Sequence, residues 1–141
     1  MQEQVREAIF QAVEREPLVR TLGMKLTELS DGFSAVEMTH DPSRMDNLFG
    51  RMHGGAIFSL IDEAFETVCQ ADGTVTVALN VNVSYVSSPE PGARLRAEAR
   101  EVSRTKKISS YDIRVTDGAG QIIATCQALA YRTGKPLPFL P

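Results

Sequence analysis

The sequence lacks the features that would place the protein in a membrane or outside the cell. No apolar run approaches the roughly 20 residues that a membrane-spanning helix requires. The first residues, Met-Gln-Glu-Gln-Val-Arg-Glu, do not show the charged start and apolar stretch of a secretory signal. We therefore expect a cytoplasmic protein that has no membrane partner.

Cysteine is scarce. The only two, Cys69 and Cys126, lie far apart in the chain and form no CxxC motif. In a reducing compartment, both are expected to be buried small apolar residues and not partners in a disulfide. A nucleophilic cysteine would need a histidine close to it in space, and the sequence leaves that alternative open.

An excess of basic residues is also missing. The chain has 15 lysine and arginine residues against 18 aspartate and glutamate residues, which gives a net charge of −3. Nucleic-acid-binding domains present a basic face, so no nucleic-acid partner is expected. Basic residues do gather locally at Arg104, Lys106 and Lys107. Such a cluster is either the solvated end of a strand or a site for a phosphorylated small molecule.

The size and composition indicate one globular domain over 1–141, with 43% hydrophobic and 23% charged residues. Within the N-terminal segment, 1–17, apolar residues recur at helical spacing, which predicts a helix over 3–16 that Pro17 ends. The last segment, 133–141, contains three prolines. We expect it to be a tail that lies over the surface.

The middle of the chain changes its periodicity. Two short strands are expected at 23–30 and 33–39, followed by a loop over 40–52 that is rich in turn-forming residues. From Gly54 to Cys69, apolar residues recur at helical spacing and indicate a largely buried helix.

Strict alternation of apolar and polar residues over 75–86 indicates a long strand with one core face. Three more strands are expected at 94–103, 107–116 and 121–132. Antiparallel strands with one main helix make an α+β layout. One helix cannot cover both faces of a long sheet, so we expect an oligomer to hide the remaining surface and a possible edge strand.

The segment that says most about chemistry runs from Asn47 through His53-Gly54-Gly55 to Asp62. The glycines stand at the start of the predicted helix, where backbone N–H groups are unpaired and the helix dipole is positive. Such a helix start can hold an oxyanion. A carboxylate on the same helix is costly to bury unless it is paired or used. The arrangement suggests attack of water on a carbonyl group, with Asp62 as the base.

Other interpretations of these residues stay open at this point. Asp62 could be a structural carboxylate, and Asn47 could serve only to shape its loop. Glu63 and Glu66 are rival carboxylates, although most such glutamates are surface residues. His53 could act as a base, but a role in fixing the loop is the better interpretation.

The motif and the elements around it resemble the hotdog-fold acyl-CoA thioesterases, in particular the branch associated with phenylacetic acid degradation. The resemblance covers about residues 18–133. It rests on Pro17-Leu-Val-Arg-Thr-Leu-Gly-Met24, on the His53-Gly54-Gly55 turn with Asn47 upstream, and on the spacing from Gly54 to Asp62. It implies a long antiparallel sheet wrapped around one central helix, an acyl-CoA substrate, and no metal or cofactor.

The resemblance also implies roles for individual residues. The N–H of Gly54 and the side chain of Asn47 would hold the thioester carbonyl, and Asp62 would be the base or the nucleophile. A polar residue on the following strand, Asn80 or Asn82, would orient the attacking water.

The remaining members of the implied site would bind the rest of the substrate. His53 and Gly55 flank the carbonyl-binding residue and would border the substrate. Arg104, Lys106 and Lys107 would meet the phosphates of coenzyme A, because such groups form charge-assisted hydrogen bonds with basic side chains.

Helix geometry adds an expectation about assembly. Gly54 and Asp62 are eight residues apart in the sequence, which corresponds to about 12 Å along a helix axis. One thioester carbon cannot reach both residues at hydrogen-bond distance. Gly54 of one subunit should therefore face Asp62 of another subunit, which predicts a homodimer or a homotetramer built from dimers.

Two other functions on the same fold stay open. One is a non-catalytic protein that binds or senses acyl-CoA, and the other is a hydratase or dehydratase that acts on acyl thioesters. Hydratases and dehydratases of this fold usually use a histidine paired with an acid on or beside the helix, and no histidine lies in 56–70. The thioesterase is therefore the preferred hypothesis.

Overall fold

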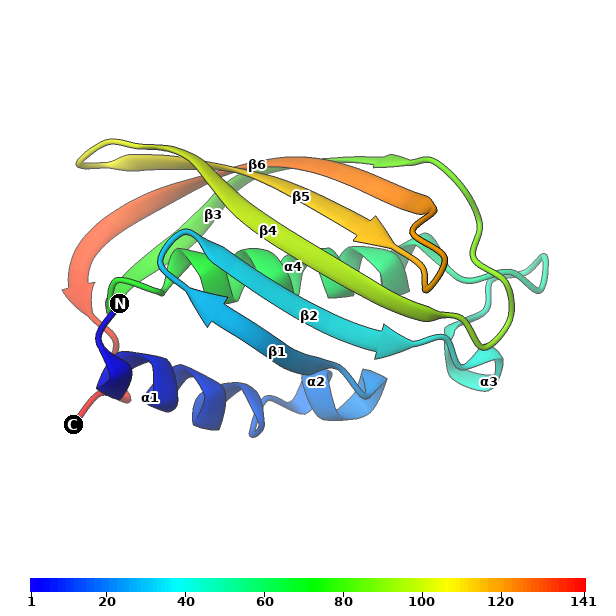
Figure 1. Cartoon of the computed structure of the whole chain (residues 1–141), viewed down its shortest axis with the longest axis horizontal. Coiled ribbons are helices and arrows are strands. Elements are labelled where there is room, and N and C mark those ends of the chain that lie inside the picture. Colours follow the sequence, from blue (N-terminus) through cyan, green and yellow to red (C-terminus); the bar gives the residue numbers. More distant parts are fainter.

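A curved antiparallel sheet wraps one long helix in the computed structural model, which describes residues 1–141 (Figure 1). The elements in chain order are α1 (Glu3–Val13), α2 (Pro17–Leu22), β1 (Lys25–Ser30), β2 (Phe33–Thr39), α3 (Pro42–Met45), α4 (Gly54–Cys69), β3 (Thr74–Tyr85), β4 (Arg94–Arg104), β5 (Ile108–Thr116) and β6 (Ile122–Pro136). The strand order in the sheet is β1-β2-β4-β5-β6-β3, and every neighbouring pair is antiparallel. This is the predicted α+β layout.

The long helix α4 forms the centre of the hydrophobic core. Ten of its 16 residues are buried, because the sheet curves around it (Figure 1). The helices α1 and α2 lie beyond β1, the strand at one edge of the sheet (Figure 1). Phe65 packs edge-on against Tyr111 of β5, with ring centroids 5.5 Å apart. No helix in the chain is both long and apolar enough to cross a membrane.

The N-terminal segment differs from the single helix that the sequence predicts over 3–16. α1 ends at Val13, and Pro17 begins α2 where it was expected to end a helix. Proline fits the first position of a helix, because an N–H there has no partner within the helix. Glu16 before it has the extended backbone that a following proline favours. Glu16 therefore lies in the link between two helices.

Two other boundaries differ from the prediction. The expected loop over 40–52 contains the short helix α3, which starts at Pro42, again at the first helical position. β6 runs to Pro136, four residues into the segment expected as a tail, because it curves with β3 and still pairs with Thr74. The shorter remaining tail packs on the domain, since Leu137 is buried.

The strand β3 lies at the edge of the sheet, and its predicted alternation is interrupted. Its register with β6 shifts at Leu79, between Ala78 and Asn80, and an irregularity of this kind turns the following side chains to the other face. A first irregularity lies between Thr74 and Thr76. In the stretch between the two, Thr76 is buried, whereas Val77 and Leu79 are 46% and 56% exposed. A long unpaired edge with exposed apolar side chains is a surface on which another chain can pair.

Candidate active site

The start of α4 presents a free backbone donor. His53 caps the helix, since its Nδ1 accepts a hydrogen bond of 2.9 Å from the N–H of Gly55. The N–H of Gly54, the first residue of the helix, has no acceptor within the chain. A donor at this end of a helix is well placed to bind an oxyanion, because the helix dipole is positive there.

Tyr85, the last residue of β3, lies over Gly54. Its hydroxyl donates a hydrogen bond of 3.1 Å to the carbonyl oxygen of Gly54. A Cβ atom added at Gly54 would stand 3.2 Å from the Cζ atom of the tyrosine ring. Glycine is therefore the residue that permits this close contact between the helix start and the end of β3.

Asn47 and Gly54 line the same open pocket of ≈ 450 Å³. The Oδ1 atom of Asn47 accepts hydrogen bonds from the N–H groups of Phe49 at 2.9 Å and Arg51 at 3.2 Å. These bonds shape the loop and leave the Nδ2 group, which carries two protons, available. Asn47 thus has the structural role that the sequence left open, and it can also donate to a carbonyl oxygen in the pocket.

A pair formed by a buried histidine and a partly exposed aspartate supports this loop, and sequence reasoning missed it. His40 is 3% exposed, and its Nε2 lies 2.6 Å from Oδ1 of Asp46. The pair holds the residue directly before Asn47 against the end of β2. No sequence signal marks it, because the partners are six residues apart in a segment without regular periodicity.

Asp62 lies on the exposed side of α4 and lines a second pocket, of ≈ 260 Å³, between α4 and β3. No side-chain hydrogen bond or ion pair is found for its carboxylate, and partial burial raises its pKa above the usual value. The bond to a serine or a neighbouring strand that a purely structural role would require is absent. An unpartnered carboxylate with a raised pKa is suited to accept a proton.

The pockets of Gly54 and Asp62 share no residue. The two residues are on one straight helix, about 12 Å apart along its axis. A single chain therefore brings Asn47 and Gly54 together but keeps Asp62 apart from them.

The polar residues predicted to orient water lie elsewhere on the sheet. Asn82 donates a hydrogen bond to Asn80 on the same strand. Asn82 also lines a pocket with Asp112 and Gln127. These two side chains are exposed and their neighbours along each strand are buried, so the pocket is on the face of the sheet opposite the core. Within one chain neither asparagine forms a hydrogen bond with Asp62, and their role stays a prediction.

The predicted phosphate-binding residues lie at the turn between β4 and β5, at the opposite end of the molecule from the start of α4 (Figure 1). Arg104 is engaged within the chain, by ion pairs with Glu101 at 2.5 Å and Asp72 at 3.5 Å. Lys106 and Lys107 are exposed. The two lysines are therefore the members of the basic cluster that can bind a phosphate group.

The cysteines do not form a nucleophilic site. Both are buried and free, as predicted. Burial raises the pKa of Cys69 to about 12 and that of Cys126 to about 11. Both thiols therefore stay protonated near neutral pH, and the thiolate is the reactive form.

Comparison with known proteins identifies a family and several relatives of this chain. A family model described as the thioesterase superfamily matches residues 49–124. A putative esterase from Archaeoglobus fulgidus is 30% identical over 138 residues, which cover 98% of this chain and 87% of the relative. The acyl-coenzyme A thioesterase PaaI of Escherichia coli is 28% identical over 121 residues, which cover 86% of each chain.

Solved structures of similar proteins share the fold of this chain. The E. coli PaaI protein from the phenylacetic acid degradation operon has a TM-score of 0.89 at 25% identity, over 95% of this chain and 96% of that chain. A Streptococcus mutans protein bound to acetyl CoA has a TM-score of 0.75 at 26% identity, over 81% of this chain and 91% of that chain. The sheet wrapped around α4 is a hotdog fold, as predicted. The chain belongs to the thioesterase superfamily, in its PaaI-like branch.

Proposed function

We propose that the protein is an acyl-CoA thioesterase, which hydrolyses the thioester to a free acid and coenzyme A. The observation that carries the proposal is the free N–H of Gly54 beside the free Nδ2 of Asn47 at the start of α4. Among the relatives, the E. coli protein is named an acyl-coenzyme A thioesterase and the S. mutans structure contains acetyl CoA.

The chemistry follows from these donors and one carboxylate. The thioester carbonyl oxygen accepts hydrogen bonds from Gly54 and Asn47, which stabilise the negative charge that develops on it. Asp62 takes a proton from water as the water oxygen bonds to the acyl carbon, or attacks that carbon itself. The carbon–sulfur bond then breaks, and the coenzyme A thiolate leaves and takes up a proton. If Asp62 attacks directly, the acyl–Asp62 anhydride that forms is hydrolysed by water, which releases the free acid and restores the carboxylate.

The proposal requires a second subunit. Gly54 and Asp62 of one chain cannot reach the same carbon, so the reacting pair comes from two chains in a homodimer, or in a homotetramer built from dimers. The free edge of β3 supports this assembly, because it exposes Val77 and Leu79 and because Val77 lines the pocket of Asp62.

An aryl-acyl group is the proposed acyl class. The pocket of Gly54 is bordered by Met52, Ile57 and Tyr85, whose apolar surfaces suit a flat ring. The E. coli relative comes from the phenylacetic acid degradation operon. The pathway of this chain and its cytoplasmic location stay predictions.

The test is release of free thiol from a panel of aryl- and fatty acyl-CoAs by the wild type, Asp62→Asn and Glu66→Gln. Asp62→Asn should lower kcat on the order of a hundredfold or more, the usual contribution of an acid–base group. Glu66→Gln removes the rival carboxylate one turn further along α4 and should retain activity.

Two results would contradict the proposal. Full activity in Asp62→Asn would remove the assigned base. Binding of acyl-CoA without turnover by the wild type would identify a binding or sensing protein on the same fold.

A further inference from the structure

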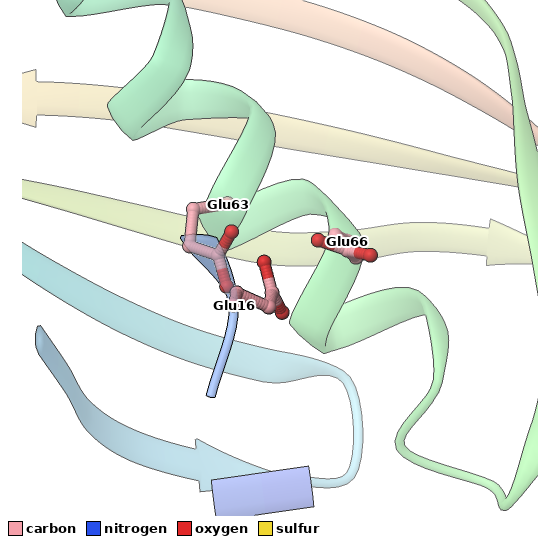
Figure 2. A group of neighbouring side chains, drawn as sticks. All are labelled: Glu16, Glu63 and Glu66. Carbon is pink, nitrogen blue, oxygen red and sulfur yellow. The ribbon is translucent and has the colours of Figure 1, made fainter. Parts of the chain in front are cut away.

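Three glutamates that the proposed reaction does not use converge beside α4. Glu63 and Glu66 come from α4, and Glu16 comes from the link between α1 and α2. Figure 2 shows the three side chains gathered where this link passes the helix. One carboxylate oxygen from each residue lies within 4.8 Å of the others. The fold thus concentrates three negative groups from two segments at one point.

The cluster contains a buried oxygen that has no partner. Glu63 is 4% exposed, and its Oε1 atom accepts no hydrogen bond. None of the ion pairs of the chain includes Glu16, Glu63 or Glu66. A buried carboxylate without a compensating charge is strongly unfavourable. The cluster therefore requires a positive species, which is either a proton or a cation.

The pKa shifts of the three glutamates also indicate that the cluster requires a positive species. Burial, followed by the charges of Glu16 and Glu66, raises the pKa of Glu63 to about 9. Burial, followed by Glu16 and Asp62, raises the pKa of Glu66 to about 7. Burial also raises the pKa of Glu16. Asp62 is the other acidic group that acts on the cluster, and no basic side chain pairs with it.

The site is also open to solvent on one side. Glu16 and Glu66 line a pocket of ≈ 300 Å³ between α4, α1 and the C-terminal tail. An ion can enter through this pocket and keep water ligands on that side, while the buried Glu63 supplies a ligand from within. Ligands on two segments with an entry path are the features expected of a cation site.

We propose that Glu16, Glu63 and Glu66 bind a hard divalent cation, with calcium as the preferred ion. Calcium takes six to eight oxygen ligands at about 2.3–2.6 Å in flexible geometry, which suits oxygens within 4.8 Å of one another. Magnesium demands stricter octahedral geometry, and zinc prefers nitrogen and sulfur ligands. The ion ties the α1–α2 link to α4, one turn from Asp62. This inference does not depend on the proposed catalytic function.

Calorimetric titration with calcium chloride tests the proposal. The full-length protein is first freed of metal with a chelator, and is then titrated at about pH 8 in two buffers that differ in ionisation enthalpy. The wild type should bind one calcium ion per chain and release protons, because the ion displaces protons held by the cluster. Its melting temperature should rise by about 3 °C or more at saturating calcium.

Three variants make the test specific. Glu63→Gln keeps the shape of the side chain and should weaken calcium binding on the order of tenfold or more. Glu16→Gln should do the same and serves if Glu63→Gln does not fold. Glu7→Gln, an exposed glutamate on α1, should bind as the wild type does.

The proposal is overturned by either of two results. Absence of binding by the wild type at about 10 mM calcium, above the range of weak protein calcium sites, would mean that shared protons alone hold the cluster. Unchanged binding in both Glu63→Gln and Glu16→Gln would place the ion at another surface.

Discussion

The proposed site depends on a single backbone N–H group at Gly54, and a substitution can remove this donor while α4 stays intact. Proline at the first helical position lacks this N–H and is well tolerated there, as Pro17 and Pro42 show in this chain. His53 before it has ψ 135°, which is the conformation that a following proline requires. We expect Gly54→Pro to lower kcat by about 10²–10³-fold, the contribution of one oxyanion donor.

Gly54→Ala is the matched control for this prediction. Alanine introduces the same Cβ atom close to Tyr85 but keeps the N–H. Steady-state kinetics and circular dichroism of both variants separate the two effects. Equal loss of activity in the alanine and proline variants, with the helix intact, would mean that space at this position matters and the donor does not.

At the scale of elements, periodicity predicted α4 and all six strands because burial repeats every 3.6 or two residues along them. Elements without such a pattern were missed. Pro17 was interpreted as a helix stop although it is equally suited to a helix start, and only the packing of α2 decides between the two. Glu63 was expected at the surface, but the α1–α2 link covers it, and a contact between distant segments leaves no mark in local sequence.

The candidate site was predictable in part for the same reason. The Asn47, Gly54 and Asp62 motif is local and recurs in a known family, so its residues could be named. The pair of His40 with Asp46 and the contact of Tyr85 with Gly54 depend on tertiary packing, and no spacing rule predicts them.

The β4–β5 turn is the element expected to bind the coenzyme A phosphates. Lys106→Glu combined with Lys107→Glu should raise KM for an acyl-CoA by about three- to tenfold at low ionic strength, because exposed charges act weakly and are screened by salt. KM for the corresponding acyl-pantetheine thioester, which lacks the nucleotide phosphates, should not change. The double variant Arg15→Glu and Lys25→Glu makes the same change in net charge at exposed positions elsewhere.

The acyl-pantetheine substrate and the Arg15→Glu, Lys25→Glu variant test whether the rise in KM comes from a lost phosphate contact. An equal rise in KM for both substrates would indicate a structural effect on the site. An equal rise in the Arg15 and Lys25 variant would indicate a general effect of net charge and would remove the phosphate contact from the turn.

At the scale of the whole molecule, the glutamate cluster should make stability depend on pH when metal is removed. The folded-state pKa of Glu63 is raised from 4.5 to about 9, and that of Glu66 from 4.5 to about 7. A raised folded-state pKa favours folding while the group is protonated, so this contribution is complete below about pH 4.5 and is lost as the pH rises towards about 9. Glu16 and Asp62 face the same cluster and add to the repulsion.

Glu63→Gln should remove most of this dependence. In the presence of a chelator, we expect the variant to be more stable than the wild type at about pH 8 by more than about 1.4 kcal/mol, the value of one pKa unit. The two proteins should converge at about pH 4.5. Urea unfolding across this range, with Glu7→Gln as control, measures the difference. A difference that does not grow with pH would mean that Glu63 does not titrate within the cluster.

The arrangement of Gly54 and Asp62 on one rigid helix leads to a prediction about the assembled molecule. If each active site takes Gly54 from one subunit and Asp62 from another, a heterodimer of Gly54→Pro and Asp62→Asn contains one intact site and one doubly altered site. Heterodimers isolated through two different affinity tags should have about half of the wild-type activity, although each parent is almost inactive. Heterodimers as inactive as the parents would mean that the two residues do not meet across a subunit interface.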